Sequence, residues 1–211
     1  EIIVYDQTER DKRNGSFPLQ FDSTRVKFVF SDQKGQASAR NNAIKQTTHD
    51  WCLLFDDDSV AMRDMATEHK RLLENGDYLI STGASLAPGQ VLSDLPYAIN
   101  FYHLADVLDT GNLFIHKSVF EKSGYLDLAF DKGPGVDNDF GTHLYRSGFK
   151  TVFNPKAVRI HYKASTGGLR TYGVWSRATT TLFGPFPPPS QTYTIKKYYD
   201  RRYWNYIFIR Y

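Results

Sequence analysis

The order of apolar and polar positions divides the first half of the chain into alternating strands and helices. Short apolar runs predict buried strands at Ile2–Tyr5, Val26–Phe30, Trp51–Phe55 and Tyr78–Ser81. Apolar residues at helical spacing predict helices over Ala37–Thr47 and Met62–Glu74. This alternation is typical of an α/β fold with a mixed, mostly parallel sheet flanked by helices.

The second half of the chain is less regular but continues the same pattern. We expect a strand over Gly111–His116, then a short helix that begins at the capping box starting with Ser118. A glycine-rich loop, "DKGPG", precedes a further helix that ends at Gly148, and two strands follow at Thr151–Phe153 and Val158–Tyr162. The pattern therefore predicts one domain over residues 1–166.

The composition changes after residue 166 and predicts a C-terminal extension over residues 167–211. The stretch "FGPFPPPS" is typical of a rigid, extended linker. The last 19 residues hold eight aromatic residues, five Lys or Arg residues and a single acid. Three interpretations stay open for this segment: a helix on a membrane surface, packing on the main domain or on a second copy, and single-stranded nucleic acid binding, which nothing else favours.

Overall composition is that of an ordinary globular protein. The 211 residues carry a net charge of +3, too small to indicate a nucleic acid partner, and 41% of them are hydrophobic. A single cysteine, Cys52, excludes an internal disulfide and lies inside an apolar run, so we expect a packed core thiol.

The most unusual local feature is "LLFDDDSV", where a buried strand runs into three consecutive aspartates, Asp56 to Asp58. Neighbouring carboxylates disfavour one another's ionisation, and a divalent cation offsets that repulsion. Mg²⁺ and Mn²⁺ take oxygen ligands, commonly carboxylates together with phosphates of a substrate. The alternative is a solvated turn whose aspartates cap the next helix.

Six motifs in order extend this interpretation: "EIIVYDQT", "GQASARNNAI", "LLFDDDSV", "GNLFIHKSVFEKSGYLDLAF", "GVDNDFGTHLYRSGF" and "RIHYKA". Together they resemble the inverting glycosyltransferases of family 2, over residues 1 to about 165. The resemblance implies the Rossmann-related GT-A fold, and a nucleotide-diphosphate sugar as donor with Mn²⁺ or Mg²⁺ as cofactor. UDP is the nucleotide that the family's habit suggests.

The resemblance also assigns roles to individual positions. For the donor, it places Asp6 at the nucleotide base, Arg40 and Asn41 along the nucleotide side of the cleft, and Gly111 and Asn112 beside the sugar. For the metal, it implies Asp56 and Asp58 as the outer members of an Asp-x-Asp motif that touches the ribose and the metal-bound diphosphate. Asp57 is the inner member, and His161 matches a further metal ligand of some relatives. Turn, surface and packing roles are the alternatives for these residues.

Inverting transfer needs a carboxylate that removes the proton from the acceptor hydroxyl. The family's Glu-Asp-x-Asp-Leu pattern falls on Val136 to Phe140, which makes Asp137 the implied base and Asp139 the second candidate. Valine at 136 departs from the family glutamate. Capping of the following helix is the alternative role for both aspartates.

The resemblance further implies a first strand–helix unit that would precede Ile2. Either further residues precede Glu1, or the chain does without the unit, or a partner chain supplies the strand.

We therefore expect an enzyme of cell-surface polysaccharide or glycolipid synthesis that acts on a saccharide or lipid-linked acceptor. We expect it in the cytoplasm or on the inner face of the cell membrane, with contact through residues 193–211, and a homodimer is a further expectation. A non-catalytic binding domain of the same fold and a metal-dependent nucleotidyltransferase are the alternatives.

Overall fold

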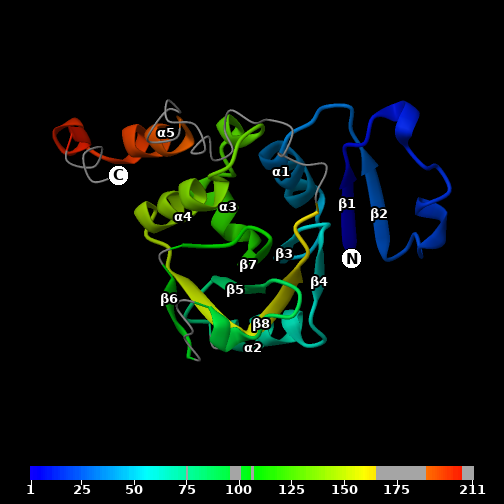
Figure 1. Ribbon diagram of the computed structural model, residues 1–211, viewed down its shortest axis with the longest axis horizontal. Coiled ribbons are helices and arrows are strands. Elements are labelled where there is room, and N and C mark those ends of the chain that lie inside the picture. Colours follow the sequence, from blue (N-terminus) through cyan, green and yellow to red (C-terminus); the bar gives the residue numbers. More distant parts are fainter. Residues whose placement is uncertain (75, 96–100, 106, 165–188, 206–211) are drawn as a thin grey trace.

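The computed structural model describes residues 1–74, 76–95, 101–105, 107–164 and 189–205 (Figure 1). The strands, in chain order, are β1 (Ile2–Asp6), β2 (Val26–Phe30), β3 (Trp51–Phe55), β4 (Ser59–Ala61), β5 (Ile80–Leu86), β6 (His103–Ala105), β7 (Asn112–His116) and β8 (Thr151–His161). The α-helices are α1 (Gln36–Gln46), α2 (Met65–Leu73), α3 (Lys117–Ser123), α4 (Val136–Arg146) and α5 (Pro189–Tyr198). The predicted domain boundary at 166/167 and most of the proline-rich stretch lie outside the described residues.

The main sheet has six strands in the order β3-β7-β5-β8-β4, with β6 also paired to β8. It is a mixed sheet between helices, as the apolar pattern predicts, but it is not mostly parallel. Among the described strands of this sheet, only β5 and β8 pair in parallel, whereas β3–β7, β5–β7, β4–β8 and β6–β8 are antiparallel. An apolar run shows that a strand is buried and carries no information on its direction, which explains the error.

Strand β8 joins the two strands predicted at 151–153 and 158–162 into one. Its parallel register with β5 shifts between Gly83 and Ala84, where Asn154 and Val158 are the successive partners. The shift brings backbone close to backbone, because a Cβ atom at Gly83 would lie 2.1 Å from the carbonyl oxygen of Ala157. Glycine is therefore required at this crossing.

Helices cover both faces of the main sheet (Figure 1). Helix α2 lies against β5 and β8, while α3 and α4 lie on the opposite side. The buried apolar cluster gathers residues of α1, β3, β7, α3 and α4, and the rings of Phe120 and Phe140 stack within it at 5.8 Å. Cys52 belongs to this cluster, which confirms the predicted core thiol.

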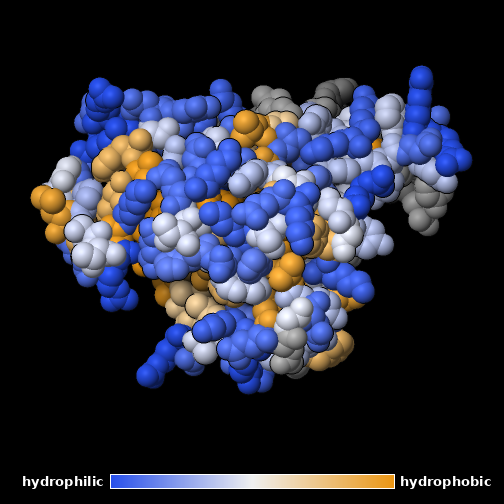
Figure 2. Space-filling view, turned by 180° about the vertical axis from the view of Figure 1, so that it is seen from behind, coloured by the Kyte–Doolittle hydropathy of each residue, from blue (hydrophilic) through white to orange (hydrophobic). Residues whose placement is uncertain are grey.

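Strands β1 and β2 form a separate parallel pair. The pair is joined to α1 by the hydrogen bond from the Asn42 amide to the Tyr5 hydroxyl, at 3.1 Å. Apolar side chains lie on the surface of this part of the molecule (Figure 2), where Phe17 and Leu19 are exposed. Phe17 packs edge-on against Phe28 of β2, so an aromatic contact joins the segment between the two strands to β2.

Helix α5 packs on α4, which favours the packing interpretation for the start of the C-terminal segment. Its Ile195 side chain is buried. In the described part of the chain, every helix is too short or too polar to cross a bilayer.

Candidate active site

The aspartates that follow β3 lie where that strand turns into β4. Strand β4 pairs antiparallel with β8, and this register sets Ser59 opposite His161. The pairing carries Asp58 to His161, with 3.2 Å between Asp58 Oδ1 and His161 Nε2. The backbone N–H of Ala164 donates to the other Asp58 oxygen at 3.0 Å.

Asp56, Asp58 and His161 form a group that fits a divalent cation. One potential ligand atom from each lies within 4.8 Å of the others, and all three side chains are partly exposed. Two carboxylates and an imidazole are a donor set that suits Mn²⁺. Asp57, between the two aspartates, is exposed and lies outside this group.

Asp56 also lies between two arginines. Arg40 of α1 donates to Asp56 Oδ1 at 2.7 Å, and Arg159 of β8 donates to Asp56 Oδ2 at 2.7 Å. Both carboxylate oxygens thus accept charge-assisted hydrogen bonds, which hold the ionised form of Asp56 in a fixed orientation. Arg40 therefore lies beside Asp56, and its place on the nucleotide side of the cleft stays a prediction.

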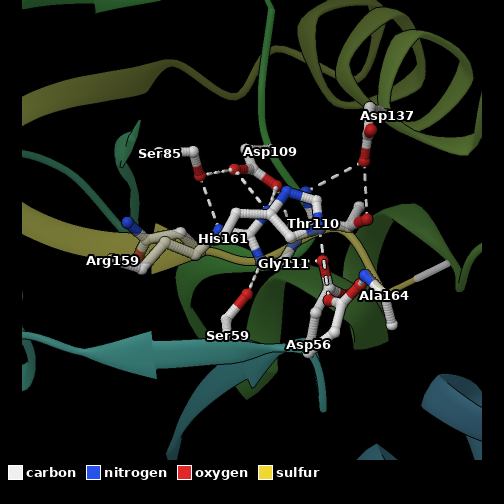
Figure 3. A network of polar contacts seen from close by, with 12 residues as sticks. Asp56, Ser59, Ser85, Asp109, Thr110, Gly111, Asp137, Arg159, His161 and Ala164 are labelled. Atoms are coloured by element: carbon white, nitrogen blue, oxygen red, sulfur yellow. Dashed lines mark hydrogen bonds and ion pairs between the residues drawn. The ribbon is translucent and has the colours of Figure 1, made fainter. Parts of the chain in front are cut away.

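Arg159 is the centre of the polar network in Figure 3 and was missed by the sequence analysis. Its side chain is 3% exposed, and it donates to both oxygens of Asp109 at 3.0 Å. It also donates to the hydroxyls of Ser59, at 3.0 Å, and Ser85, at 2.5 Å. One buried cation thereby joins β4, β5, β8, the end of β3 and the loop before β7.

Gly111 and Asn112 follow Asp109 at the start of β7. A Cβ atom at Gly111 would lie 2.1 Å from Asp56 Oδ2 and 2.2 Å from Arg159 Nη1, so glycine here makes room for the ion pair. The Asn112 side chain is fully buried and donates to the carbonyl oxygens of Ala84 and Ala157. Asn112 therefore connects neighbouring strands. The predicted contact of its side chain with the donor sugar does not fit this buried position.

Asp137 lies in the first turn of α4 and faces the same network (Figure 3). The backbone N–H and the hydroxyl of Thr110 both donate to Asp137 Oδ1, at 2.9 and 2.5 Å. Burial raises the pKa of the Asp137 carboxyl, and the Thr110 hydrogen bonds offset only part of that rise. A partly buried carboxyl with a raised pKa is suited to proton transfer.

Asp139 is held elsewhere. Its side chain is 3% exposed and pairs with Lys197 of α5 at 3.0 Å. Burial raises the pKa of Asp139 against the opposing effect of Lys197. The structure thus separates the two predicted candidates for the base: Asp137 joins the network around Asp56, and Asp139 joins the C-terminal helix.

Two residues that the sequence predicts to contact the nucleotide-sugar donor form hydrogen bonds with nearby backbone groups. Asn41 is buried and exchanges hydrogen bonds with the backbone of Leu126, at 2.8 and 3.0 Å, so it braces the core in place of lining the cleft. Asp6 ends β1, where its Oδ1 accepts the backbone N–H of Thr8 at 2.8 Å. Asp6 is partly exposed, and its role at a nucleotide base remains a prediction.

Comparison with solved structures identifies the fold. A solved structure described as GalNAc-T7 with UDP, GalNAc and Mn²⁺ matches with a TM-score of 0.64 at 10% sequence identity. The match covers 77% of this chain and 37% of that chain, so this chain spans little more than a third of its structural relative. The likeness shows a GT-A-like fold.

The family model described as glycosyl transferase family 2 matches residues 1–148. The chain therefore belongs to glycosyl transferase family 2, which confirms the resemblance seen in the sequence. A search of curated proteins gave no match.

Proposed function

We propose that this chain transfers a sugar from a nucleotide-diphosphate donor to a hydroxyl acceptor, with inversion at the anomeric carbon and with a divalent metal as cofactor. The observation that carries the proposal is the presence, in one network, of the group Asp56, Asp58 and His161 and of the partly buried carboxyl of Asp137. The first fits a metal-bound diphosphate, and the second fits a general base.

Asp58 and His161 would hold the metal. One oxygen of Asp56 would join them, and its hydrogen bond to an arginine would then give way to the contact with the cation. When bound, Mn²⁺ or Mg²⁺ supplies positive charge beside the diphosphate leaving group. Arg40 lies at the same place with its side chain 19% exposed, so it adds a second positive charge on the side of α1. UDP is the proposed nucleotide; the structural relative is described with UDP and Mn²⁺.

Asp137 would accept the proton of the acceptor hydroxyl. As the acceptor oxygen forms its bond to the anomeric carbon, the bond from that carbon to the phosphate oxygen breaks, and its electron pair leaves with the nucleoside diphosphate. Both Thr110 donors act on Asp137 Oδ1. They orient the carboxylate so that Oδ2 is the oxygen that takes the proton.

The biological setting belongs to the proposal as well: synthesis of a cell-surface polysaccharide or glycolipid on a saccharide or lipid-linked acceptor, within a catalytic domain over residues 1–166. Contact of residues 193–211 with the inner face of a cell membrane and a homodimer remain predictions from the sequence.

The test is release of UDP from UDP-glucose, UDP-N-acetylglucosamine and UDP-N-acetylgalactosamine, with water as acceptor, in MnCl₂ and in EDTA. We expect manganese-dependent turnover of one donor. Asp137→Asn should lower kcat about 10²–10⁴-fold, because it removes the base, and leave the Kd for UDP unchanged. No turnover of any donor, or equal turnover in EDTA, would contradict the proposal and favour a binding domain or metal-free chemistry.

The control for the metal group is Asp64→Asn. Asp64 is an exposed aspartate six residues beyond Asp58, and its side chain makes no capping hydrogen bond. Asp58→Asn should abolish turnover and metal-dependent UDP binding, whereas Asp64→Asn should retain both.

A further inference from the structure

Helix α5 packs on the segment 127–135, which directly precedes the helix that carries the proposed base, Asp137. The Tyr193 ring packs edge-on against Phe130 at 5.7 Å, and its hydroxyl donates to Asp127 at 2.8 Å. Ser190, at the start of α5, is buried against Gly135, where an added Cβ would lie 3.3 Å from the serine Cβ. Helix α5 thus contacts both ends of the segment 127–135.

Lys197 fastens the last turn of α5 to two carboxylates at once. Its ammonium lies 2.6 Å from Asp127 Oδ2 and 3.0 Å from Asp139 Oδ2. Burial lowers the pKa of Lys197, but the hydrogen bonds to Asp127 and Asp139 outweigh that effect and raise it, so the lysine stays charged. Because the Asp139 side chain is almost wholly buried, loss of Lys197 would leave a carboxylate without its counter-charge.

The same segment is fastened on its other side to α1. The Gln36 side-chain amide donates to the carbonyl oxygens of Phe130 and Gly133, at 3.0 and 2.6 Å. Asp131 Oδ1 accepts the backbone N–H of Ser38 at 2.7 Å. Helix α1 also carries Arg40, the partner of Asp56. The segment 127–135 is therefore held between α1, which contributes Arg40 to the site, and the C-terminal helix α5.

This clamp ends at the first turn of α4, where Asp137 and Asp139 lie two positions apart and project from different faces of the helix. Asp137 points to Thr110, and Asp139 points to Lys197. We propose that Lys197 is a positioning residue for glycosyl transfer: through Asp139 and Asp127 it fixes the turn that holds Asp137 within reach of the acceptor hydroxyl. This inference rests on the proposed function.

The first test compares Lys197→Ala with Lys197→Arg and with the control Lys196→Ala, using UDP release from the UDP-sugar that the wild-type chain hydrolyses. Lys196 is the exposed neighbour on the same helix, and its ammonium lies over the Trp204 ring. We expect Lys197→Ala to lower kcat about 10–100-fold, because small misplacement of a catalytic group is costly. The KM for the donor should not change, Lys197→Arg should recover most of the rate, and Lys196→Ala should match the wild type.

A second variant separates positioning from stability. Lys197→Ala combined with Asp139→Asn removes both charges, so no buried carboxylate is left without a partner. We expect its Tm to return toward the wild-type value while kcat stays low. Recovery of kcat together with Tm would overturn the proposal, as would an unchanged kcat in Lys197→Ala well below its Tm.

Hydrogen exchange gives a readout that does not need activity. In Lys197→Ala, backbone amides of residues 128–137 should exchange at least about tenfold faster, while those of Trp51–Phe55 keep their wild-type rates. If the wild-type chain hydrolyses no UDP-sugar, the proposed function fails and the clamp is still judged by this measurement. Unchanged exchange in residues 128–137 would overturn the positioning role.

Discussion

Replacement of Arg159 by methionine tests how the site is held together. Arg159 is 3% exposed and makes five hydrogen bonds, to Asp56, Asp109, Ser59 and Ser85. Methionine keeps much of the volume and removes the charge, which leaves Asp109 without its counter-ion and leaves Asp56 with Arg40 alone. Removing one partner of a buried ion pair costs about 3–5 kcal/mol.

The cost of Arg159→Met should lie near the lower end of that range. Asp56 and Asp109 are 23% and 28% exposed, so water recovers part of the lost solvation once the arginine is gone. We therefore expect a decrease of about 3 kcal/mol in the free energy of unfolding, measured by urea denaturation with circular dichroism.

Arg71→Met is the matched control. The Arg71–Glu68 pair has the same 2.7 Å separation as Arg159–Asp56, but the Arg71 side chain is 55% exposed. Exposed pairs contribute roughly 0–1 kcal/mol, so the control should change stability by less than about 1 kcal/mol. Equal losses in the two variants would refute the argument that burial makes Arg159 the anchor of the site.

Three further predictions follow from particular positions. Gly83→Ala should lower the unfolding free energy by about 1–3 kcal/mol, because its Cβ would lie 2.1 Å from the Ala157 carbonyl oxygen, whereas Gly15→Ala, with open space around it, should have little effect in the same urea titration. Burial lowers the pKa of His69, so the unfolded chain binds a proton before the folded chain does as the pH falls below about 6.5. The free energy of unfolding should therefore fall with decreasing pH, by up to about 1.4 kcal/mol per pH unit. A His69→Gln variant whose free energy of unfolding has the same slope against pH would refute this. The raised pKa of Asp137 should place the acid limb of kcat/KM above the ordinary aspartate value of about 3.9, with activity lost as the pH falls through it; a limb at or below that value would argue against Asp137 as the base.

The sequence predicted where the strands lie better than how they pair. The run Trp51–Phe55 is a strand as expected, because a continuous apolar stretch followed by charges has few other stable conformations. Its antiparallel partner β7 lies about 60 residues further along the chain, and nothing in either run encodes that direction. Short-range pattern therefore defined the elements, and long-range packing defined the sheet.

The candidate site shows the same division. The aspartates after β3 were predicted because their clustering is local. Arg159 was not, because its partners Asp56 and Asp109 come from positions 103 and 50 residues away and meet it only through the register of β4, β5 and β8. The "DTGN" stretch before β7 was a usable signal for Asp109, since polar residues that enter a buried strand need partners.

Helical geometry separates the two candidates for the base, and the sequence alone already held that information. Residues two apart on a helix do not share a face, so Asp137 and Asp139 were never equivalent. Asp137 meets Thr110, whereas Asp139 meets Lys197 of α5, and no local pattern predicts either of these long-range contacts.

The central claim is that Asp58 and His161 hold a divalent cation on which a nucleoside diphosphate is bound. The most direct measurement is an anomalous difference map from crystals of this chain grown with MnCl₂ and UDP. A single manganese peak in contact with both side chains and with the UDP phosphates is the predicted result. Manganese and UDP bound elsewhere, with Asp58 and His161 still paired to each other, would contradict the account.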